Sequence, residues 1–290
     1  MKNLDLSTLP AKKRKQIVSC LRAGIQLLYF LFLPSVFTAA FNGVKYIFTQ
    51  LGQGEKIEMT AFVSALLLVC AFTIVFGRFF CGFACAFGSL GDAMHAIYGI
   101  ICKKRKKKPR RIKPETAKKL VLIKYGILLL IALCCFAGVY QKARGTSPWD
   151  VFSMLHAGNF RLSSYIPGIV LLVLILVGMF FEERFFCHFL CPMGAVFSLL
   201  PILPFFTLHR KRENCIRGCS ACTRQCPSAV ELPSDGSVEI SGDCFQCQKC
   251  IDTCPKGNIR CGVKEFHGNE ILFTLFRAVF LLTLLLWAGI

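Results

Sequence analysis

The sequence predicts a membrane all-α protein with five transmembrane helices and a small α+β ferredoxin-like domain. The 290 residues are 54% hydrophobic, and their mean hydropathy of +0.56 is too apolar for an ordinary soluble domain. Five apolar stretches are long enough to cross roughly 30 Å of hydrocarbon. The 18 cysteines fall largely into tight groups. In a large membrane chain this indicates metal-binding thiolates in a reducing compartment rather than disulfides.

The predicted spans lie on both sides of the cysteine-rich segment. The first could be taken for a signal peptide, but its apolar part is too long and contains Arg22, so we expect an uncleaved helix. Arg22, Lys124 and Arg277 lie inside spans and are expected to snorkel to the lipid headgroups. The spans are placed near Ile17–Ala40, Met59–Phe80, Leu120–Tyr140, Tyr165–Phe181 and Ile271–Ile290.

The lysine and arginine distribution predicts the orientation of these spans. Basic segments precede the first span at 11–15, join the second to the third at 103–119, and follow the fourth at 209–212. The positive-inside rule places all three in the cytoplasm. We therefore expect an integral, multi-pass protein of the cell (inner) membrane, with the N-terminus and the ferredoxin domain cytoplasmic and the C-terminus outside. The net charge of +19 then reflects topology and contact with membrane lipid, not nucleic acid.

An internal repeat accompanies the spans. The segment RFFCGFAC at 78–85 aligns with RFFCHFLC at 184–191, an offset of 106 residues, and Gly88 aligns with Gly194. Two helical hairpins with the same orientation would be parallel repeats, related by an axis along the membrane normal. The predicted outer segments are Asn42–Glu58 and Gln141–Ser164.

The segment after the fourth span carries two cysteine runs, each closed by a Cys-Pro pair. The downstream run matches C-x2-C-x2-C-x3-C-P, which is typical of bacterial [4Fe–4S] ferredoxins, and the upstream run has one extra residue in its first gap. Zinc sites also use C-x2-C, but they do not usually need the third cysteine or the closing Cys-Pro. The eight predicted cluster ligands are Cys215, Cys219, Cys222, Cys226, Cys244, Cys247, Cys250 and Cys254.

The last cysteine of each run is expected to serve the cluster of the other run. Three thiolates from one short loop can reach three irons of a cube, and in two-cluster ferredoxins the fourth ligand comes from the other run. We therefore assign Cys254 to the upstream cluster and Cys226 to the downstream one. Cys261 lies beyond the pattern and is expected to be a spare thiol.

The repeat contains a second kind of cysteine arrangement, at the membrane edge. Cys81 and Cys85 are four residues apart, as are Cys187 and Cys191, at the cytoplasmic ends of the second and fourth spans. If the helix continues through them, each pair projects from one face, and the repeat can bring four thiols to one point. These thiols could hold an additional iron–sulfur cluster, form a redox-active disulfide pair, bind copper(I), or be small apolar fillers.

These elements divide the chain into five predicted segments. We expect a first transmembrane hairpin at 1–102, a basic cytoplasmic loop at 103–119, a second hairpin at 120–208, a ferredoxin-type domain with two [4Fe–4S] clusters at 209–265, and a C-terminal transmembrane helix at 266–290.

With its duplicated RFFC-x3-C segment followed by a double cysteine run, the chain resembles the NapH/NosR-type membrane polyferredoxins over nearly its whole length. The resemblance implies electron transfer between a quinol or cytoplasmic donor, such as a flavoprotein or ferredoxin, and a partner reductase or flavoprotein. We find no motif for substrate chemistry, so we expect an electron-transfer subunit rather than a stand-alone enzyme. The alternative is a metal-handling or assembly factor, such as a copper reductase for oxidase maturation.

Overall fold

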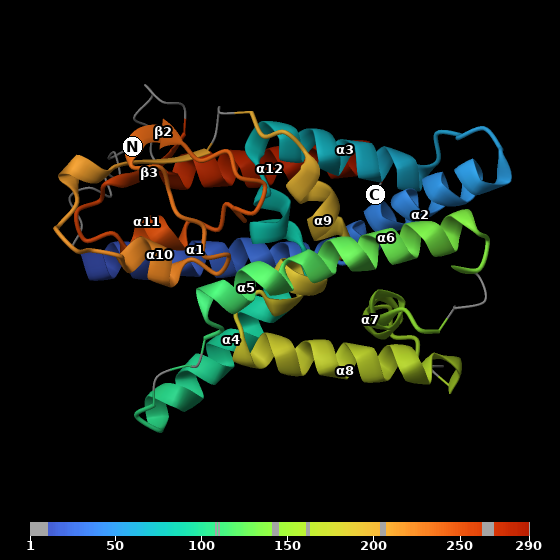
Figure 1. Cartoon of the computed structure of the whole chain (residues 1–290), viewed down its shortest axis with the longest axis horizontal. Helices are drawn as coiled ribbons and strands as arrows, with labels where there is room; N and C mark the ends of the chain where they lie inside the picture. The colour runs from blue at the N-terminus through green and yellow to red at the C-terminus, as the bar shows by residue number, and fades with distance from the viewer. Residues whose placement is uncertain are drawn as a thin grey trace.

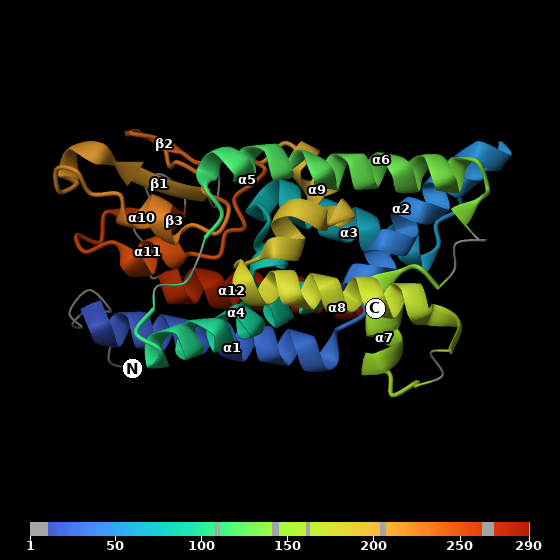
Figure 2. The same cartoon turned by 60° about the horizontal axis from the view of Figure 1, so that its bottom comes forward.

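The computed structural model describes residues 11–107, 109, 111–140, 145–160, 163–203, 207–262 and 270–289. The segment limits predicted at 1, 265, 266 and 290 therefore lie outside the described residues. Long helices fill most of the molecule, and a unit with the short strands and helices α10 and α11 lies at one end (Figure 1). Viewed from another side, α6 and α8 run nearly parallel along the helical part (Figure 2).

The first predicted span is a bent pair of helices. Helix α1 covers Ala11–Phe32 and α2 covers Val36–Gln53, and their axes differ by 61°. Pro34 falls in the break, where its ring and missing N–H prevent the helix from continuing. The prediction of one helix across Ile17–Ala40 was therefore wrong, and much of the segment predicted as an outer loop is helical.

The remaining apolar helices differ in length. Three described helical segments are long and apolar enough to cross a membrane, namely Glu115–Phe136, Ser163–Phe181 and Glu270–Trp287, and the bent pair can count as a fourth. The apolar helix Ala61–Phe76 is shorter. With their labels, the helices of this part that follow α2 are α3 Ala61–Phe76, α4 Ala86–Lys104, α5 Pro114–Leu120, α6 Leu122–Phe136, α7 Pro148–His156, α8 Ile166–Phe181, α9 Pro192–Leu199 and α12 Glu270–Trp287.

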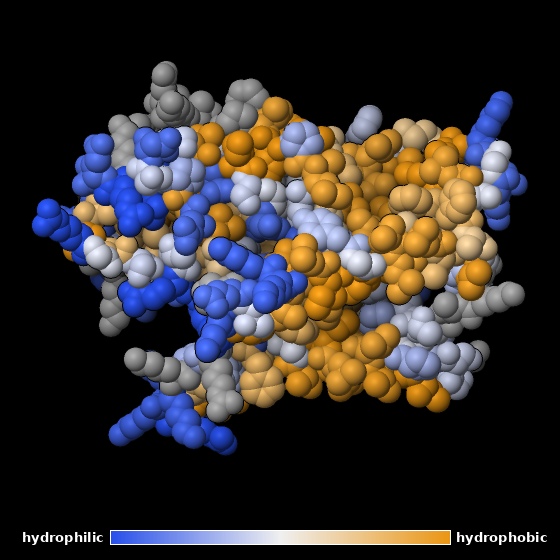
Figure 3. All heavy atoms as spheres, viewed as in Figure 1, coloured by the Kyte–Doolittle hydropathy of each residue, from blue (hydrophilic) through white to orange (hydrophobic). Residues whose placement is uncertain are grey.

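The surface divides by polarity along the long axis of the molecule. In the view of Figure 3, hydrophobic residues cover the helical part and hydrophilic residues gather at the opposite end. Many large apolar side chains of α6 and α8 are exposed, such as Leu130 at 62% and Leu174 at 60%. Such apolar exposure on long helices is expected of a membrane protein, because lipid and not water surrounds them.

The two halves of the helical part use the same packing pattern. Helix α1 packs on α4 and on the turn at 80–84, and α6 packs on α9 and on the turn at 186–190. Helix α2 packs on α3 as α7 packs on α8. The five-span count and the hairpin arrangement remain predictions.

The polar end is a small antiparallel sheet with two short helices. The strands are β1 Thr207–Lys211, β2 Asp235–Val238 and β3 Ile259–Gly262, in the order β2-β1-β3. His209 pairs with Val238 on one side and with Arg260 on the other. Helices α10 (Ala221–Gln225) and α11 (Lys249–Thr253) pack together beside the sheet, each within one of the two cysteine runs.

Candidate metal centres

Each membrane-edge cysteine pair lies on a π-helical turn. The turns are η2 (Phe80–Ala84) and η5 (Phe186–Leu190), which occupy the same positions of the repeat. The N–H groups of Cys85 and Cys191 donate to carbonyls five residues earlier, at 2.8 Å in both turns. The condition of a continuous α-helix through the pairs is therefore not met, and the four thiols are brought together by π turns instead. Single π turns inside helices are common at functional sites because they change where side chains point.

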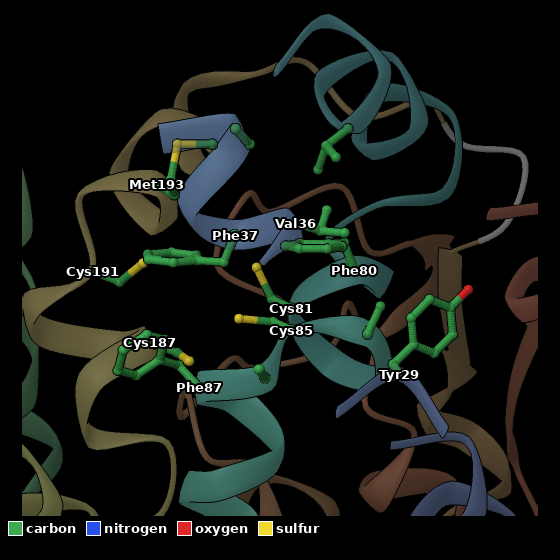
Figure 4. Close-up of a cluster of buried hydrophobic side chains, with 14 of the residues drawn as sticks. Tyr29, Val36, Phe37, Phe80, Cys81, Cys85, Phe87, Cys187, Cys191 and Met193 are labelled. Carbon is green, nitrogen blue, oxygen red and sulfur yellow. The ribbon is translucent and has the colours of Figure 1, made fainter. Parts of the chain in front are cut away.

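The four membrane-edge thiols gather in the interior. Cys81, Cys85, Cys187 and Cys191 are each at most 5% exposed, and their side chains point into a common space beside Phe37 and Phe87 (Figure 4). Burial raises the pKa of Cys187 to about 11, and Cys81 adds to the rise. Burial and the other three thiols likewise hold the pKa of Cys191 well above its usual value. Four thiolates would need compensating positive charge or a bound cation.

Backbone N–H groups already face two of these sulfurs. The N–H of Gly194 donates to Cys191 Sγ at 3.1 Å, and the N–H of Gly88 makes the matching interaction with Cys85. Hydrogen bonds to sulfur are one of the means by which proteins stabilise and tune iron–sulfur clusters. The four-thiol donor set and these N–H groups therefore fit a cluster with thiolate ligands.

Two fully buried arginines cross between the repeats. Arg184 of the second repeat donates to the carbonyl oxygens of Cys81 and, at 2.8 Å, of Gly82 in the first. A Cβ at Gly88 would lie 2.6 Å from Arg184 Nη1, so only glycine leaves room for this guanidinium. In the opposite direction, a Cβ at Gly194 would lie 2.9 Å from Arg78 Nη2 and 3.0 Å from the Cys187 carbonyl oxygen.

Acidic residues hold both guanidinium groups in place. Asp92 accepts from Arg184 Nε at 2.9 Å and from Nη2 at 2.5 Å, and it also accepts from Gln26 at 2.8 Å. Arg78 lies 3.8 Å from Asp243, which is also 2.7 Å from Lys124 Nζ. Each arginine thus has a carboxylate partner in addition to the nearby thiols, and this carboxylate fixes the position of the guanidinium group.

One cluster predicted for the ferredoxin unit has its four cysteines together. Cys226, Cys244, Cys247 and Cys250 line one cavity, which Cys222 of the upstream run also lines. Burial raises the pKa of Cys226 to about 11, with Cys247 as the next contribution. This is the set assigned from the sequence to the downstream cluster, including the crossed ligand Cys226.

The other predicted set is joined by Asn258. Its backbone N–H donates to Cys254 Sγ at 3.3 Å and its side-chain amide donates to Cys215 Sγ at 3.4 Å. Cys219 is partly exposed, and Cys222 accepts from Arg210 at 3.2 Å. The structure thus brings the crossed residue Cys254 to the first cysteine of the upstream run. Across the residues that the structure describes, no three His, Cys, Asp or Glu side chains are arranged to hold a single metal ion.

The ferredoxin unit reaches the residues beside the membrane-edge thiols through the loop around Phe245. The Phe245 ring is 4.7 Å from the Arg78 guanidinium and 5.8 Å from that of Arg184. Gln246 and Gln248 of this loop have left-handed backbone angles, with φ of 51° and 61°. Such angles are uncommon outside glycine and here let the loop curve around Cys247.

Three intramembrane bases have partners within the protein instead of snorkelling, and two of them attach helices to the ferredoxin unit. Arg22 on α1 pairs with Asp252 on α11 at 3.0 Å, and Lys124 on α6 pairs with Asp243. Arg277 on α12 is fully buried and lies 4.6 Å from the centre of the Phe79 ring. The expectation that these side chains reach the headgroups was therefore wrong, because buried acidic and aromatic partners hold them inside.

Only some of these residues carry a signal that can be recognised in the sequence. Arg78 and Arg184 were visible as the first letter of the duplicated RFFC segment, although no role was assigned to them. Asp92, Asp243 and Phe245 were missed, because each acts through a contact more than 80 residues away in the sequence.

Comparison with known proteins points to the same segments. A family model described as a 4Fe-4S binding domain matches residues 59–109 and 166–207. These residues contain all four membrane-edge cysteines and end before the eight-cysteine segment. No solved structure matches the chain.

Three relatives illustrate the range of similar proteins. An uncharacterized protein of Methanocaldococcus jannaschii is 26% identical over 83% of this chain and 93% of its own length. Ferredoxin-type protein NapH of Haemophilus influenzae is 24% identical over 72% of this chain and 70% of its own length. Regulatory protein NosR of Pseudomonas aeruginosa is 24% identical over 70% of this chain but only 29% of its own length.

The matching family model and these relatives support a membrane polyferredoxin of the NapH/NosR type. This polyferredoxin therefore has an iron–sulfur electron-transfer role. Its family match covers the segment whose chemistry the sequence had left open between a cluster, a disulfide pair and copper. The match, the four buried thiols and the N–H groups facing sulfur together favour the cluster.

Proposed function

We propose that this polyferredoxin carries electrons along three [4Fe–4S] clusters, two in the ferredoxin unit and one at the membrane edge. Such clusters accept and donate single electrons. The observation that carries the proposal is the contact between the two kinds of site. A Cβ at Gly82, beside Cys81, would overlap the carbonyl oxygen of Phe245, which follows Cys244. Ligands of neighbouring centres thus lie within one backbone contact of each other.

The proposed ligand sets follow the structure. Cys215, Cys219, Cys222 and Cys254 form the outer set, of which Cys222 and its Arg210 partner are the most buried part. Cys226, Cys244, Cys247 and Cys250 form the middle set, whose thiols line one cavity within the ferredoxin unit. Cys81, Cys85, Cys187 and Cys191 form the membrane-edge set. The partly exposed outer set is the place where a cytoplasmic flavoprotein or ferredoxin would exchange an electron.

A cavity beside the membrane-edge set supports a quinone as the other electron carrier. The cavity holds about 490 Å³ between α1 and α4. Its polar lining includes Arg22, Gln26 and Asp92, and its apolar lining includes Leu27 and Phe30. The Nε of Arg22 is buried without a hydrogen-bond partner. An amphipathic molecule from the bilayer fits such a mixed lining, with its polar head toward Asp92.

The orientation proposed from the sequence agrees with the placement of the elements. Helix α1 begins beside the ferredoxin unit, while α12 ends toward the opposite end of the molecule (Figure 2). A cytoplasmic ferredoxin unit and an outer C-terminus then follow from the basic segments. A partner reductase subunit would complete the chain of electron transfer, since we find no substrate-binding motif.

The test is the iron and acid-labile sulfide content of anaerobically purified protein, together with EPR of the reduced form. Three clusters give about twelve irons per chain, four for each cluster. The double variant Cys81→Ser, Cys187→Ser should lose about four irons, and Cys261→Ser serves as a matched buried-thiol control with no loss. About eight irons in the unchanged protein would refute the membrane-edge cluster. Stoichiometric copper lost in the double variant would support the metal-handling alternative.

A further inference from the structure

The cysteines and phenylalanines of the repeated RFFC segment pack in the interior of the molecule. The segment also repeats an arginine, which is not one of the proposed cluster ligands. Arg78 and Arg184 are each 1% exposed. A charged side chain this deep is retained only with charged or polar groups nearby, and its removal is costly where those groups are fixed. Both arginines are therefore part of a built arrangement rather than chance burial.

The arrangement is reciprocal. Arg184 donates to the Cys81 and Gly82 carbonyls of the first repeat, and Arg78 fills the space left by Gly194 beside the Cys187 carbonyl of the second. The glycine three residues after the second cysteine is what admits the guanidinium in each case, since a Cβ would lie within 3 Å of it. Each repeat thus supplies an arginine that reaches into the other. Arg184 bonds to the cysteine turn itself, and Arg78 lies against Gly194 and donates to Ser198 Oγ at 3.3 Å.

The same two guanidinium groups also face the ferredoxin unit. Both lie over the ring of Phe245, at 4.7 and 5.8 Å from its centre, and Arg78 donates to the Gly242 carbonyl at 3.1 Å. Two positive charges are consequently fixed between the membrane-edge thiols and the loop that carries Cys244 and Cys247. One guanidinium group can make these contacts in several directions because its N–H donors form a planar fork, which a lysine side chain lacks.

We infer that Arg78 and Arg184 are positioning residues that form a crossed clamp. Each holds the cysteine-bearing turn of the opposite repeat, and together they raise the reduction potential of the membrane-edge centre. Reduction adds one negative charge to a thiolate-bound cluster, and nearby positive charge stabilises the reduced form. The effect on the reduction potential rests on the proposed function, because it requires a cluster at the membrane edge. The clamp between the two repeats does not require a cluster.

The crossed clamp is tested by thiol alkylation mapped by mass spectrometry. Four variants, Arg78→Gln, Arg184→Gln, Arg78→Lys and Arg184→Lys, are compared with the unchanged protein and with Arg22→Gln, which removes another buried arginine. We expect Arg184→Gln to increase labelling of Cys81 and Cys85, and Arg78→Gln to increase labelling of Cys187 and Cys191. Increased labelling of a variant's own repeat, or of neither repeat, would overturn the clamp. This readout holds whether or not the thiols carry a cluster.

The electrostatic part is tested by an EPR-monitored redox titration of the same proteins. We expect both glutamine variants to shift the membrane-edge centre to a lower potential and to leave the two ferredoxin clusters unchanged. The lysine variants keep the charge and should show a smaller shift. Unchanged potentials in the glutamine variants would overturn this part. If the glutamine variants lose the centre, lysine variants that retain it support the charge effect, and lysine variants that also lose it refute that effect.

The result also separates this inference from the proposed function. If the unchanged protein contains only about eight irons, two clusters of four, the membrane-edge cluster is refuted. The effect of the two arginines on the reduction potential of that cluster is then refuted with it. The alkylation pattern would still decide whether Arg78 and Arg184 hold the opposite turns.

Discussion

Gly82 lies so close to Phe245 that a Cβ on the glycine would overlap the phenylalanine carbonyl oxygen. Gly82 follows Cys81 in the first π turn, and Phe245 follows Cys244 in the ferredoxin run. The corresponding position of the second repeat is His188, whose ring lies edge-on to the Phe245 ring with 6.3 Å between their centres. The two repeats therefore meet Phe245 differently, the first through its backbone at Gly82 and the second through a side chain. The absence of a side chain at Gly82 is therefore a condition for contact between the two kinds of centre.

Gly82→Ala should weaken this contact. The added methyl cannot be accommodated by a flexible side chain, because it meets backbone, and we expect a loss of stability of about 1–3 kcal/mol, as for other overpacked sites. Gly126→Ala on α6 is the matched control, since nothing lies within 4 Å of its Cβ position. Thermal unfolding and the rate of electron transfer from a soluble donor to the membrane-edge centre should both fall only in Gly82→Ala. Equal behaviour of the two variants would contradict the close contact.

The crossed ligand assignment predicts which cysteine variants share a phenotype. Cys226 lines the same cavity as Cys244 and Cys250, while Cys254 and Cys215 share Asn258. Cys226→Ser should therefore change the same EPR signal as Cys250→Ser, although these cysteines belong to different runs. Cys254→Ser should change the signal that Cys215→Ser changes. Pairing of the phenotypes by run, Cys226 with Cys215 and Cys254 with Cys250, would refute the assignment.

Much of the cofactor chemistry could be predicted because it depends on short-range spacing. The two ferredoxin runs and the duplicated RFFC segment are local patterns, and the set that they predict around Cys226 lines one cavity in the structure. The break at Pro34 was missed, because the apolar run continues across it, and so were the π turns, because periodicity does not distinguish them from an α-helix. The ion pairs of Arg22 and Lys124 depend on distant partners that no local pattern indicates.

The ion pair of Asp92 with Arg184 predicts a pH range of constant stability. Burial alone would raise the pKa of Asp92, but Arg184 and Lys249 outweigh burial and hold that pKa below its usual range. A carboxyl group with a lowered pKa contributes its full stabilisation above the pKa of the unfolded chain, and this is lost only as the pH falls toward the folded pKa. The contribution should therefore be constant at all pH values above about 5.

Asp92→Asn tests this expectation. Loss of the carboxylate leaves the guanidinium of Arg184 buried without its acidic partner, and we expect a loss of about 3–5 kcal/mol. The free energies of unfolding of the variant and the unchanged protein should differ by the same amount from about pH 8 to about pH 5. Glu115→Gln, at an exposed position of α5, is the control and should change little. A difference that already falls between pH 7 and pH 5 would show that Asp92 takes up its proton in that range.

The hydrogen-bonded pair of Gln248 and Thr274 predicts how α12 holds the ferredoxin loop. The Gln248 amide donates to Thr274 Oγ1 at 3.0 Å, and both side chains are buried. Thr274→Val keeps the shape but leaves the buried amide without this partner, which should cost about 1–3 kcal/mol. Thr283→Val on the exposed face of the same helix is the matched control, because Thr283 bonds only to its own helix at Phe280.

Limited proteolysis of the loop around Cys247 is the measurement that isolates this effect. Thr274→Val should speed cleavage there, and Thr283→Val should not. Adding Gln248→Leu to Thr274→Val replaces both partners by apolar groups and should restore much of the protection, because no buried polar group is then left unpaired. If the double variant is cleaved faster than Thr274→Val alone, α12 holds the loop through the left-handed backbone at Gln248 rather than through this hydrogen bond.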